Sequence, residues 1–104
     1  MDPIANCASL EEVRANIDRI DRQLVALLAE RGAYVKQVVR FKKTIDDVKA
    51  PQRAEQVISQ VTALAQELGA NPVVTEQVYR AMISAFINVE LVEHSQLNQD
   101  AANP

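Results

Sequence analysis

Apolar residues recur every three or four positions from Ser9 to Lys43, a stretch that contains no cluster of turn-forming residues. This spacing predicts an amphipathic helix of about 33–35 residues. Ser9 and Glu12 match the S-x-x-E pattern of a capping box, which places the helix start at Ser9. The apolar stripe consists of Leu10, Val13, Ile17, Ile20, Leu24, Leu27, Tyr34, Val38 and Phe41. It lacks a member near position 31, where the sequence has Arg31.

A second, shorter helix is expected after a break in this pattern. The polar segment 44–50 has no apolar periodicity, and we interpret it as a loop. Pro51 suits the first turn of a helix over 51–68, because its missing N–H has no partner there in any case. Gly69 then gives the usual signal for a helix end.

A third helix is expected over 72–95, since Asn71 followed by proline is typical of a helix start. Its middle, 81–92, is apolar on nearly all sides, which predicts burial on most of them. The polar tail 96–104 is expected to be disordered. No segment has the alternation of a β-strand, so the predicted fold class is all-α, with one long N-terminal helix and two shorter ones.

The first helix is longer than a compact domain of this size can cover. At about 1.5 Å per residue it would be roughly 50 Å long. The radius of gyration of a compact domain of about 100 residues is only about 13 Å. Half of the apolar stripe would therefore be exposed in a monomer, and we expect a twofold homodimer that shares this helix.

Length and composition indicate a small soluble protein. The 104 residues suffice for one domain, which we place over 1–104, with an ordered part at about 9–95 and flexible ends. The net charge of −3 gives no reason to expect nucleic acid or an anionic membrane as a partner. Cys7 is the single cysteine, and no apolar run approaches the roughly 18 residues of a membrane helix. The first residues lack the basic and apolar regions of a secretion signal, so we expect a cytoplasmic protein.

Arg31 and Lys42 would point the same way on a continuous helix. Lys42 lies eleven positions after Arg31, which corresponds to a rotation of about 20° and a rise of about 16 Å. With the apolar Val35 and Val38 between them, the two cations could hold both ends of a small dianion, because a guanidinium binds a carboxylate bidentately. Alternatively, Arg31 extends along the helix edge into water and Lys42 is solvated, and spacing alone slightly favours this alternative.

Two further arginines could reach the same ligand. Arg14 lies roughly 25 Å along the helix from Arg31, too far to serve one pocket within a subunit, but an antiparallel dimer could deliver it to the partner. Arg53 opens the second helix, and the short segment before it could return it to the side of Lys42. A solvated surface charge is the alternative for both arginines.

Glu90 follows Ile83, Phe86 and Ile87 on one face of the most apolar helix. A carboxylate in such surroundings is unfavourable unless it is paired or protonated. Glu90 is therefore either the partner of an arginine from the first helix or an acid with a raised pKa that donates a hydrogen bond to a ligand. His94, four residues later, is expected to be a surface residue near the helix end.

No other cluster in the sequence indicates chemistry. No group of Cys, His, Asp or Glu has the spacing of metal ligands, and neither a glycine-rich phosphate loop nor a Ser/His/Asp set is present. We therefore expect no metal site and no covalent nucleophile.

Five short motifs, each weak alone, follow one another along the chain. They are V-R-x-x-I-D-R-I-D at 13–21, L-L-A-E-R at 27–31, V-x-R-F-K at 38–42, A-P-x-R at 50–53 and F-I-x-V-E at 86–90. In order and spacing this set resembles the all-helical chorismate mutase family, over roughly residues 10–93. The resemblance implies an intertwined homodimer of three-helix subunits with two active sites. Each site would receive an arginine from the first helix of the other subunit.

The resemblance also implies a role for each candidate residue. Arg31 and Arg14 of the partner subunit would bind the substrate carboxylates, and Arg53 would lie over the substrate. Lys42 would bind a carboxylate and the ether oxygen of the breaking C–O bond, and Glu90 would donate a hydrogen bond to that oxygen. The apolar walls would be Val35, Val38 and Ile87. The implied reaction is a pericyclic rearrangement of chorismate to prephenate that needs no cofactor.

Two positions depart from the mutase pattern. Many chorismate mutases have Asp three residues before the arginine of the second helix and Glu directly after it, where this chain has Ala50 and Ala54. The A-P-x-R and R-F-K motifs are more similar to the isochorismate-pyruvate lyase branch, which makes salicylate and pyruvate from isochorismate. That branch has Gln at the position of Glu90, which favours the mutase. We therefore expect a chorismate mutase, with the lyase as the alternative and a non-catalytic helical dimer or regulatory domain as a second alternative.

Overall fold

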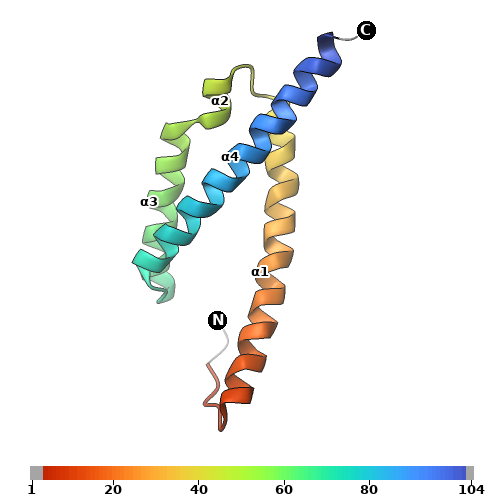
Figure 1. Ribbon diagram of the computed structural model, residues 1–104. Coiled ribbons are helices and arrows are strands. Elements are labelled where there is room, and N and C mark those ends of the chain that lie inside the picture. The colour runs from red at the N-terminus through yellow and green to blue at the C-terminus, as the bar shows by residue number, and fades with distance from the viewer. Residues whose placement is uncertain (1–3, 103–104) are drawn as a thin grey trace. The chain divides into compact units, whose positions relative to one another are not determined.

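A computed structural model describes residues 4–102 as helices joined by short connections (Figure 1). The helices are α1 (Leu10–Val39), α2 (Ile45–Lys49), α3 (Pro51–Leu68) and α4 (Pro72–Ala102). No strand occurs in this part of the chain, so the predicted all-α class is confirmed. The chain divides into two compact units, Met1–Ala33 and Tyr34–Pro104, and α1 begins in the first and ends in the second.

The start of α1 follows the capping signal in the sequence. The backbone N–H of Glu12 donates to Ser9 Oγ at 3.1 Å. The Glu12 carboxylate accepts a 2.8 Å hydrogen bond from the N–H of Ala8, one residue before the position that a regular capping box uses. Glu11 and Glu12 also lie in the first turn, where the helix dipole favours negative charge. Ser9 therefore caps the helix, as predicted.

The end of α1 lies earlier than the sequence pattern indicates. The helix ends at Val39 rather than near Lys43. Tight turns follow, in which Phe41 N–H donates to the carbonyl of Val38 at 2.9 Å and Lys42 N–H to that of Val39 at 3.0 Å. Lys42 therefore lies outside the helix, and the prediction that it shares a helical face with Arg31 is wrong.

The segment expected to be a loop contains the short helix α2. Thr44 is its N-cap, and Thr44 and Asp47 form a capping box in which each side chain accepts a hydrogen bond from the other residue's backbone. Ala50 ends α2 in the left-handed conformation, with φ at 33°. Val48 points inward and is only 1% exposed. The loop prediction for 44–50 is therefore wrong, because capping and the burial of one valine stabilise a helix that is too short to show periodicity.

The sequence predicted α3 and the start of α4 correctly. Gly69 ends α3 with φ at 76°, and the side-chain oxygen of Asn71 accepts hydrogen bonds from the N–H groups of Val73 and Val74 at 2.9 and 3.2 Å. The predicted end of α4 near Ser95 is wrong, because the helix continues to Ala102. The sequence after Pro72 has no glycine and no proline before residue 104, so its polarity alone does not end the helix. Residues 103–104 lie outside the described part.

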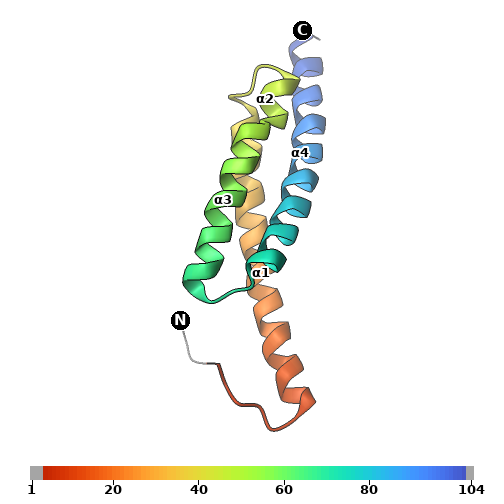
Figure 2. The ribbon, with the colours of Figure 1, turned by 90° about the vertical axis from the view of Figure 1, so that its left-hand side faces the viewer.

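Helix α4 packs against both α3 and α2 within the second unit (Figures 1 and 2). The apolar residues buried there are Val39, Val48, Ile58 and Ala65. Arg80 of α4 bridges Glu55 of α3 at 2.9 Å and Glu76 of its own helix at 3.3 Å. The hydrogen bonds from Arg80 hold the pKa of Glu55 below its usual value. All three side chains are substantially exposed, so the bridge adds little to stability.

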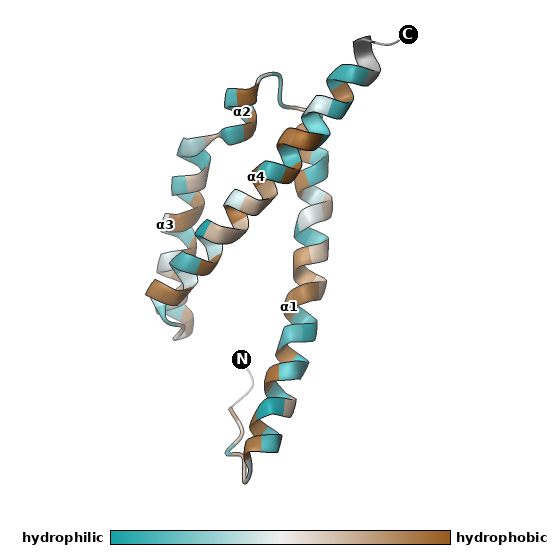
Figure 3. Cartoon of the chain, viewed as in Figure 1, coloured by the Kyte–Doolittle hydropathy of each residue, from teal (hydrophilic) through white to brown (hydrophobic). Residues whose placement is uncertain are grey.

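Large apolar side chains remain exposed on every helix, and most of them lie on α1 and α4. On α1 the stripe alternates with polar positions (Figure 3), and Leu24 and Leu27 are 52% and 60% exposed. The middle of α4 is not buried on most sides in the single chain, because Val89 and Val92 are 47% and 64% exposed. None of the described helices is long and apolar enough to span a membrane.

Replacing Gly69 with alanine is expected to lower the free energy of unfolding by about 1 kcal/mol, because an L side chain is disfavoured at positive φ. A Cβ atom built there would meet no other atom within 4 Å, so the effect comes from the backbone alone. Urea denaturation at a fixed protein concentration measures it. An unchanged midpoint would show that Gly69 does not adopt this conformation.

Ala50→Gly is the matched control, with the opposite expected sign. Ala50 carries a side chain at positive φ and is also the N-cap of α3, where glycine is preferred over alanine. The substitution is expected to raise the free energy of unfolding by up to about 1 kcal/mol in the same experiment. Destabilisation by Ala50→Gly would contradict the left-handed backbone at this junction.

Candidate functional site

Lys42 and Arg53 line the same open cavity, between the turn after α1 and the start of α3. The cavity has a volume of about 630 Å³. Its lining residues are Phe41, Lys42, Lys43, Asp46, Asp47, Ala50, Pro51, Gln52 and Arg53. The short segment that contains α2 therefore returns Arg53 to the side of Lys42, as the sequence suggested. Three cationic and two anionic side chains border this cavity, which gives it a small formal excess of positive charge.

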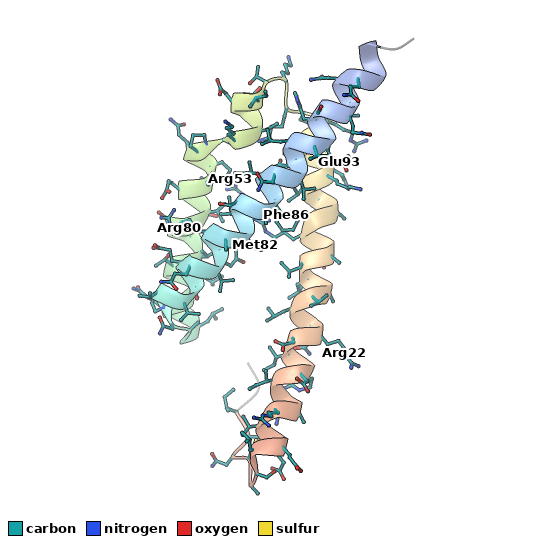
Figure 4. All side chains as sticks on the ribbon, in the orientation of Figure 1. Arg22, Arg53, Arg80, Met82, Phe86 and Glu93 are labelled. Atoms are coloured by element: carbon teal, nitrogen blue, oxygen red, sulfur yellow. The ribbon has the colours of Figure 1, made fainter. Side chains whose placement is uncertain are left out.

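The side chains of these two cations are held in different ways. Lys42 is half-buried, and its Nζ donates a 2.6 Å hydrogen bond to the backbone carbonyl of Asp47. Arg53 is exposed on the first turn of α3 (Figure 4), and its Nη1 donates to Gln56 Oε1 at 2.8 Å. A guanidinium has five N–H donors, so this bond still leaves Arg53 capable of binding a carboxylate.

Asp47 keeps a negative charge at the edge of the cavity. Its Oδ2 accepts hydrogen bonds from the backbone N–H groups of Lys43 and Thr44, both at 3.2 Å. These bonds, first the one from Lys43, lower the pKa of the Asp47 carboxyl, and the positive charge of Lys42 adds a smaller effect in the same direction. Asp47 is therefore ionised at neutral pH.

Glu90 is buried on α4, with 7% of its surface exposed. The expectation of a buried carboxyl group at this position is therefore confirmed. His94, one turn later, is also 7% exposed, so its predicted surface location is wrong. It lies well inside α4 because the helix continues to Ala102. The ring Nδ1 of His94 lies 3.4 Å from Asn98 Nδ2.

A second cavity, of about 430 Å³, lies beside this histidine. It is lined by Ile45, Leu91, His94, Ser95, Asn98 and Gln99. Ile45 comes from α2 and the other residues come from α4, so the cavity marks the contact between these two helices. No signal in the sequence indicated this cavity, because the place of His94 inside α4 depends on where that helix ends.

The residues proposed as apolar walls are distributed over α1 and α4. Ile87 lines a third cavity, of about 330 Å³, between α3 and α4. The lining of that cavity consists of Lys49, Pro51, Ala54, Glu55, Ile58, Arg80, Ile83, Ser84 and Ile87. Val35 is half-buried and Val38 is exposed in the last turns of α1. Ile87 and Lys42 thus line different cavities, although Pro51 borders both.

Arg14 and Arg31 lie on the part of α1 that belongs to the first unit. Arg14 is exposed near the start of the helix, and Arg31 lies eight residues before its end. Among residues 4–102, no group of three or more His, Cys, Asp or Glu side chains is arranged to hold a metal ion.

Comparison with known proteins identifies the family. The family model for chorismate mutase type II matches residues 13–91. The isochorismate pyruvate lyase of Pseudomonas aeruginosa is 30% identical over 97 residues, which cover 93% of this chain and 95% of that protein. A bifunctional chorismate mutase/prephenate dehydratase of Aquifex aeolicus is 29% identical over 85 residues, which cover 78% of this chain but only 24% of the larger protein.

The matched region includes every residue that the sequence motifs singled out, from Arg14 to Glu90. The all-helical fold agrees with this match. The chain therefore belongs to the chorismate mutase type II family of enzymes.

Proposed function

We propose that the protein is a chorismate mutase, which converts chorismate to prephenate by a pericyclic rearrangement. The observation that carries this proposal is the shared cavity of Lys42 and Arg53 in a chain of this family. Glu90, buried on α4, is the proposed hydrogen-bond donor to the ether oxygen. The rearrangement breaks one C–O bond and forms one C–C bond within a single molecule, so it needs neither a cofactor nor a metal ion.

The cations bind the two carboxylates of the substrate. Arg31 and Arg14 of the partner subunit provide bidentate guanidinium groups, and Arg53 closes the cavity beside Lys42. Binding both carboxylates restrains the substrate in its reactive conformation, which lowers the entropy cost of reaching the transition state. Val35, Val38 and Ile87 are the proposed apolar walls for the ring, although Ile87 and Lys42 line different cavities in the single chain.

Lys42 and Glu90 act on the bond that breaks. Negative charge develops on the ether oxygen in the transition state, and donors held in place beforehand stabilise it. Lys42 donates to this oxygen and to a carboxylate, and protonated Glu90 donates a second hydrogen bond to the oxygen. Because Glu90 is buried, a hydrogen bond from it to the ether oxygen would compete little with bulk water.

The active form is a homodimer in which α1 is shared. The apolar stripe of α1 is exposed in the single chain, and a second copy of the chain is the simplest surface to cover it. In this dimer Arg14 of each subunit enters the site of the other. We also propose that the enzyme works in the cytoplasm, because its single cysteine gives it no need for an oxidising compartment.

Isochorismate-pyruvate lyase activity is the second candidate. The observation that favours it is the match to the lyase of Pseudomonas aeruginosa over 95% of that protein. Ala50 and Ala54 agree with it, because neither supplies a carboxylate for the ring hydroxyl of chorismate. The same cations serve this reaction, in which the C–O bond of isochorismate breaks and a ring hydrogen moves to the methylene carbon of the enolpyruvyl group, giving salicylate and pyruvate.

Incubation with each substrate separates the two activities. Purified protein is expected to convert chorismate to prephenate, detected by chromatography and by the loss of chorismate absorbance. Isochorismate is the parallel sample, and fluorescent salicylate together with pyruvate would identify the lyase. If the protein converts neither compound, both proposals are rejected.

Glu90→Gln tests the role of the buried acid. If the protonated carboxyl group donates to the ether oxygen, wild-type kcat/KM decreases as pH rises through the range in which Glu90 loses its proton. The glutamine variant donates at every pH, so its profile is expected to be flat over the same range. Wild-type activity that is already constant from about pH 5 to 8 would contradict this role.

Mixing two inactive variants tests the shared site. Arg14→Ala and Arg31→Ala homodimers each lack one arginine in both sites and are expected to be nearly inactive. After denaturation and joint refolding, half of the dimers contain one subunit of each variant. In each of these mixed dimers, one of the two sites has both arginines and the other has neither. The mixture should therefore regain about a quarter of wild-type activity. No recovery, with mixed dimers confirmed by mass spectrometry, would place both arginines in the site of one subunit.

A further inference from the structure

Lys42 is held by the backbone of the short helix that follows it. Its Nζ donates a 2.6 Å hydrogen bond to the carbonyl oxygen of Asp47. In an α-helix this oxygen would accept the N–H of the residue four positions later. That residue is Pro51, which has no N–H. The ammonium group of Lys42 therefore takes the place of the missing backbone donor.

The side chain of Asp47 fixes the same carbonyl group relative to the chain beside Lys42. Its carboxylate accepts hydrogen bonds from the N–H groups of Lys43 and Thr44, both at 3.2 Å. In return, its own N–H donates to Thr44 Oγ1 at 3.0 Å. Three hydrogen bonds thus join Asp47 to the two residues that directly follow Lys42.

Helix α2 is also anchored on its inner side. Val48 is fully buried and α2 packs against α4. At the other end of α2, the N–H of Ala50 donates to the carbonyl of Asp46 at 2.9 Å. The carbonyl group of Asp47, which accepts the hydrogen bond from Lys42, therefore belongs to a helix that is held at both ends and at its centre.

From this geometry we propose that Asp47 is a positioning residue for Lys42, whose capping box holds the ammonium group where it meets the substrate. The inference rests on the role of Lys42 in the proposed function. An ammonium group has three N–H donors. One is used on Asp47, and two remain for the substrate carboxylate and the ether oxygen. Asp47 acts only through Lys42 and transfers no proton.

Without the capping box, the first turn of α2 loses its side-chain acceptors for the backbone N–H groups. The carbonyl of Asp47 then moves, and Lys42 returns to the many rotamers of a free lysine. Because catalysis depends on a donor placed beforehand, this loss reduces turnover even though the lysine is still present.

The test is a double-mutant cycle on the dimeric protein, with the substrate that the wild type converts. Asp47→Ala is expected to lower kcat/KM about tenfold or more. In a Lys42→Ala background the same substitution should change the residual kcat/KM less than about twofold. Asp47→Asn keeps a side-chain oxygen that can accept the same backbone hydrogen bonds, so it should restore most of the activity. Glu67→Ala removes an exposed carboxylate at the far end of α3 and is the control for the loss of charge.

Acetylation of lysines by limiting acetic anhydride gives a readout that does not depend on activity. Mass spectrometry is expected to show faster labelling of Lys42 in Asp47→Ala than in the wild type, with Lys36 unchanged as the internal reference. Lys36 lies on α1 and is 3.7 Å from Glu93, away from the capping box. Equal labelling of Lys42 in both proteins would overturn the inference even where Lys42→Ala leaves no measurable turnover.

The outcomes separate this inference from the proposed function. Wild-type turnover in Lys42→Ala would reject the proposed role of Lys42, and the inference with it. A slow Lys42→Ala together with a fully active Asp47→Ala would reject the inference alone. An equal loss from Asp47→Ala in both backgrounds would show a structural role in folding, and would also reject it.

Discussion

The apolar stripe of α1 is the constraint on which the rest of the molecule depends. Leu24 and Leu27 are more than half exposed, whereas the buried apolar residues of the second unit are few and small. At about 25 cal/mol per Å² of apolar surface, covering such a stripe stabilises the fold considerably. In the proposed dimer this covering is provided by the same helix that carries Arg14 and Arg31. Folding, association and substrate binding would then all depend on α1.

The fold could be predicted wherever a local signal decides the structure. Ser9, Gly69 and Asn71 each mark a helix end through a hydrogen bond or a left-handed backbone that the residue type favours. The ends of α1 and α4 were missed because no residue marks them. Helix α1 stops within an apolar pattern that continues to Phe41, and α4 continues through a polar sequence that merely lacks a breaker.

Helix α2 shows why a polar segment is not necessarily a loop. Thr44 and Asp47 have the spacing of a capping box, a signal that is present in the sequence. A helix of five residues has no apolar period, so periodicity cannot reveal it. Its stability comes from the capping hydrogen bonds and from the burial of Val48, and this burial depends on tertiary packing against α4.

The structure agrees with some of the positions expected for the candidate site residues and contradicts others. Lys42 was assigned to the helical face of Arg31, but it lies in the turn after α1 and lines a cavity together with Arg53. The burial of Glu90 followed from its apolar neighbours, whereas the burial of His94 did not, because it depends on where α4 ends.

The choice of substrate in the proposed reaction depends on a few positions. Chorismate and isochorismate carry the same two carboxylates and the same ether, so in the proposed site Arg31, Lys42 and Arg53 would bind both alike. Under that proposal, the choice between them would fall to Glu90 and to the carboxylates that Ala50 and Ala54 do not provide. A site without an acceptor for the ring hydroxyl discriminates weakly between substrates that differ in the position of that hydroxyl.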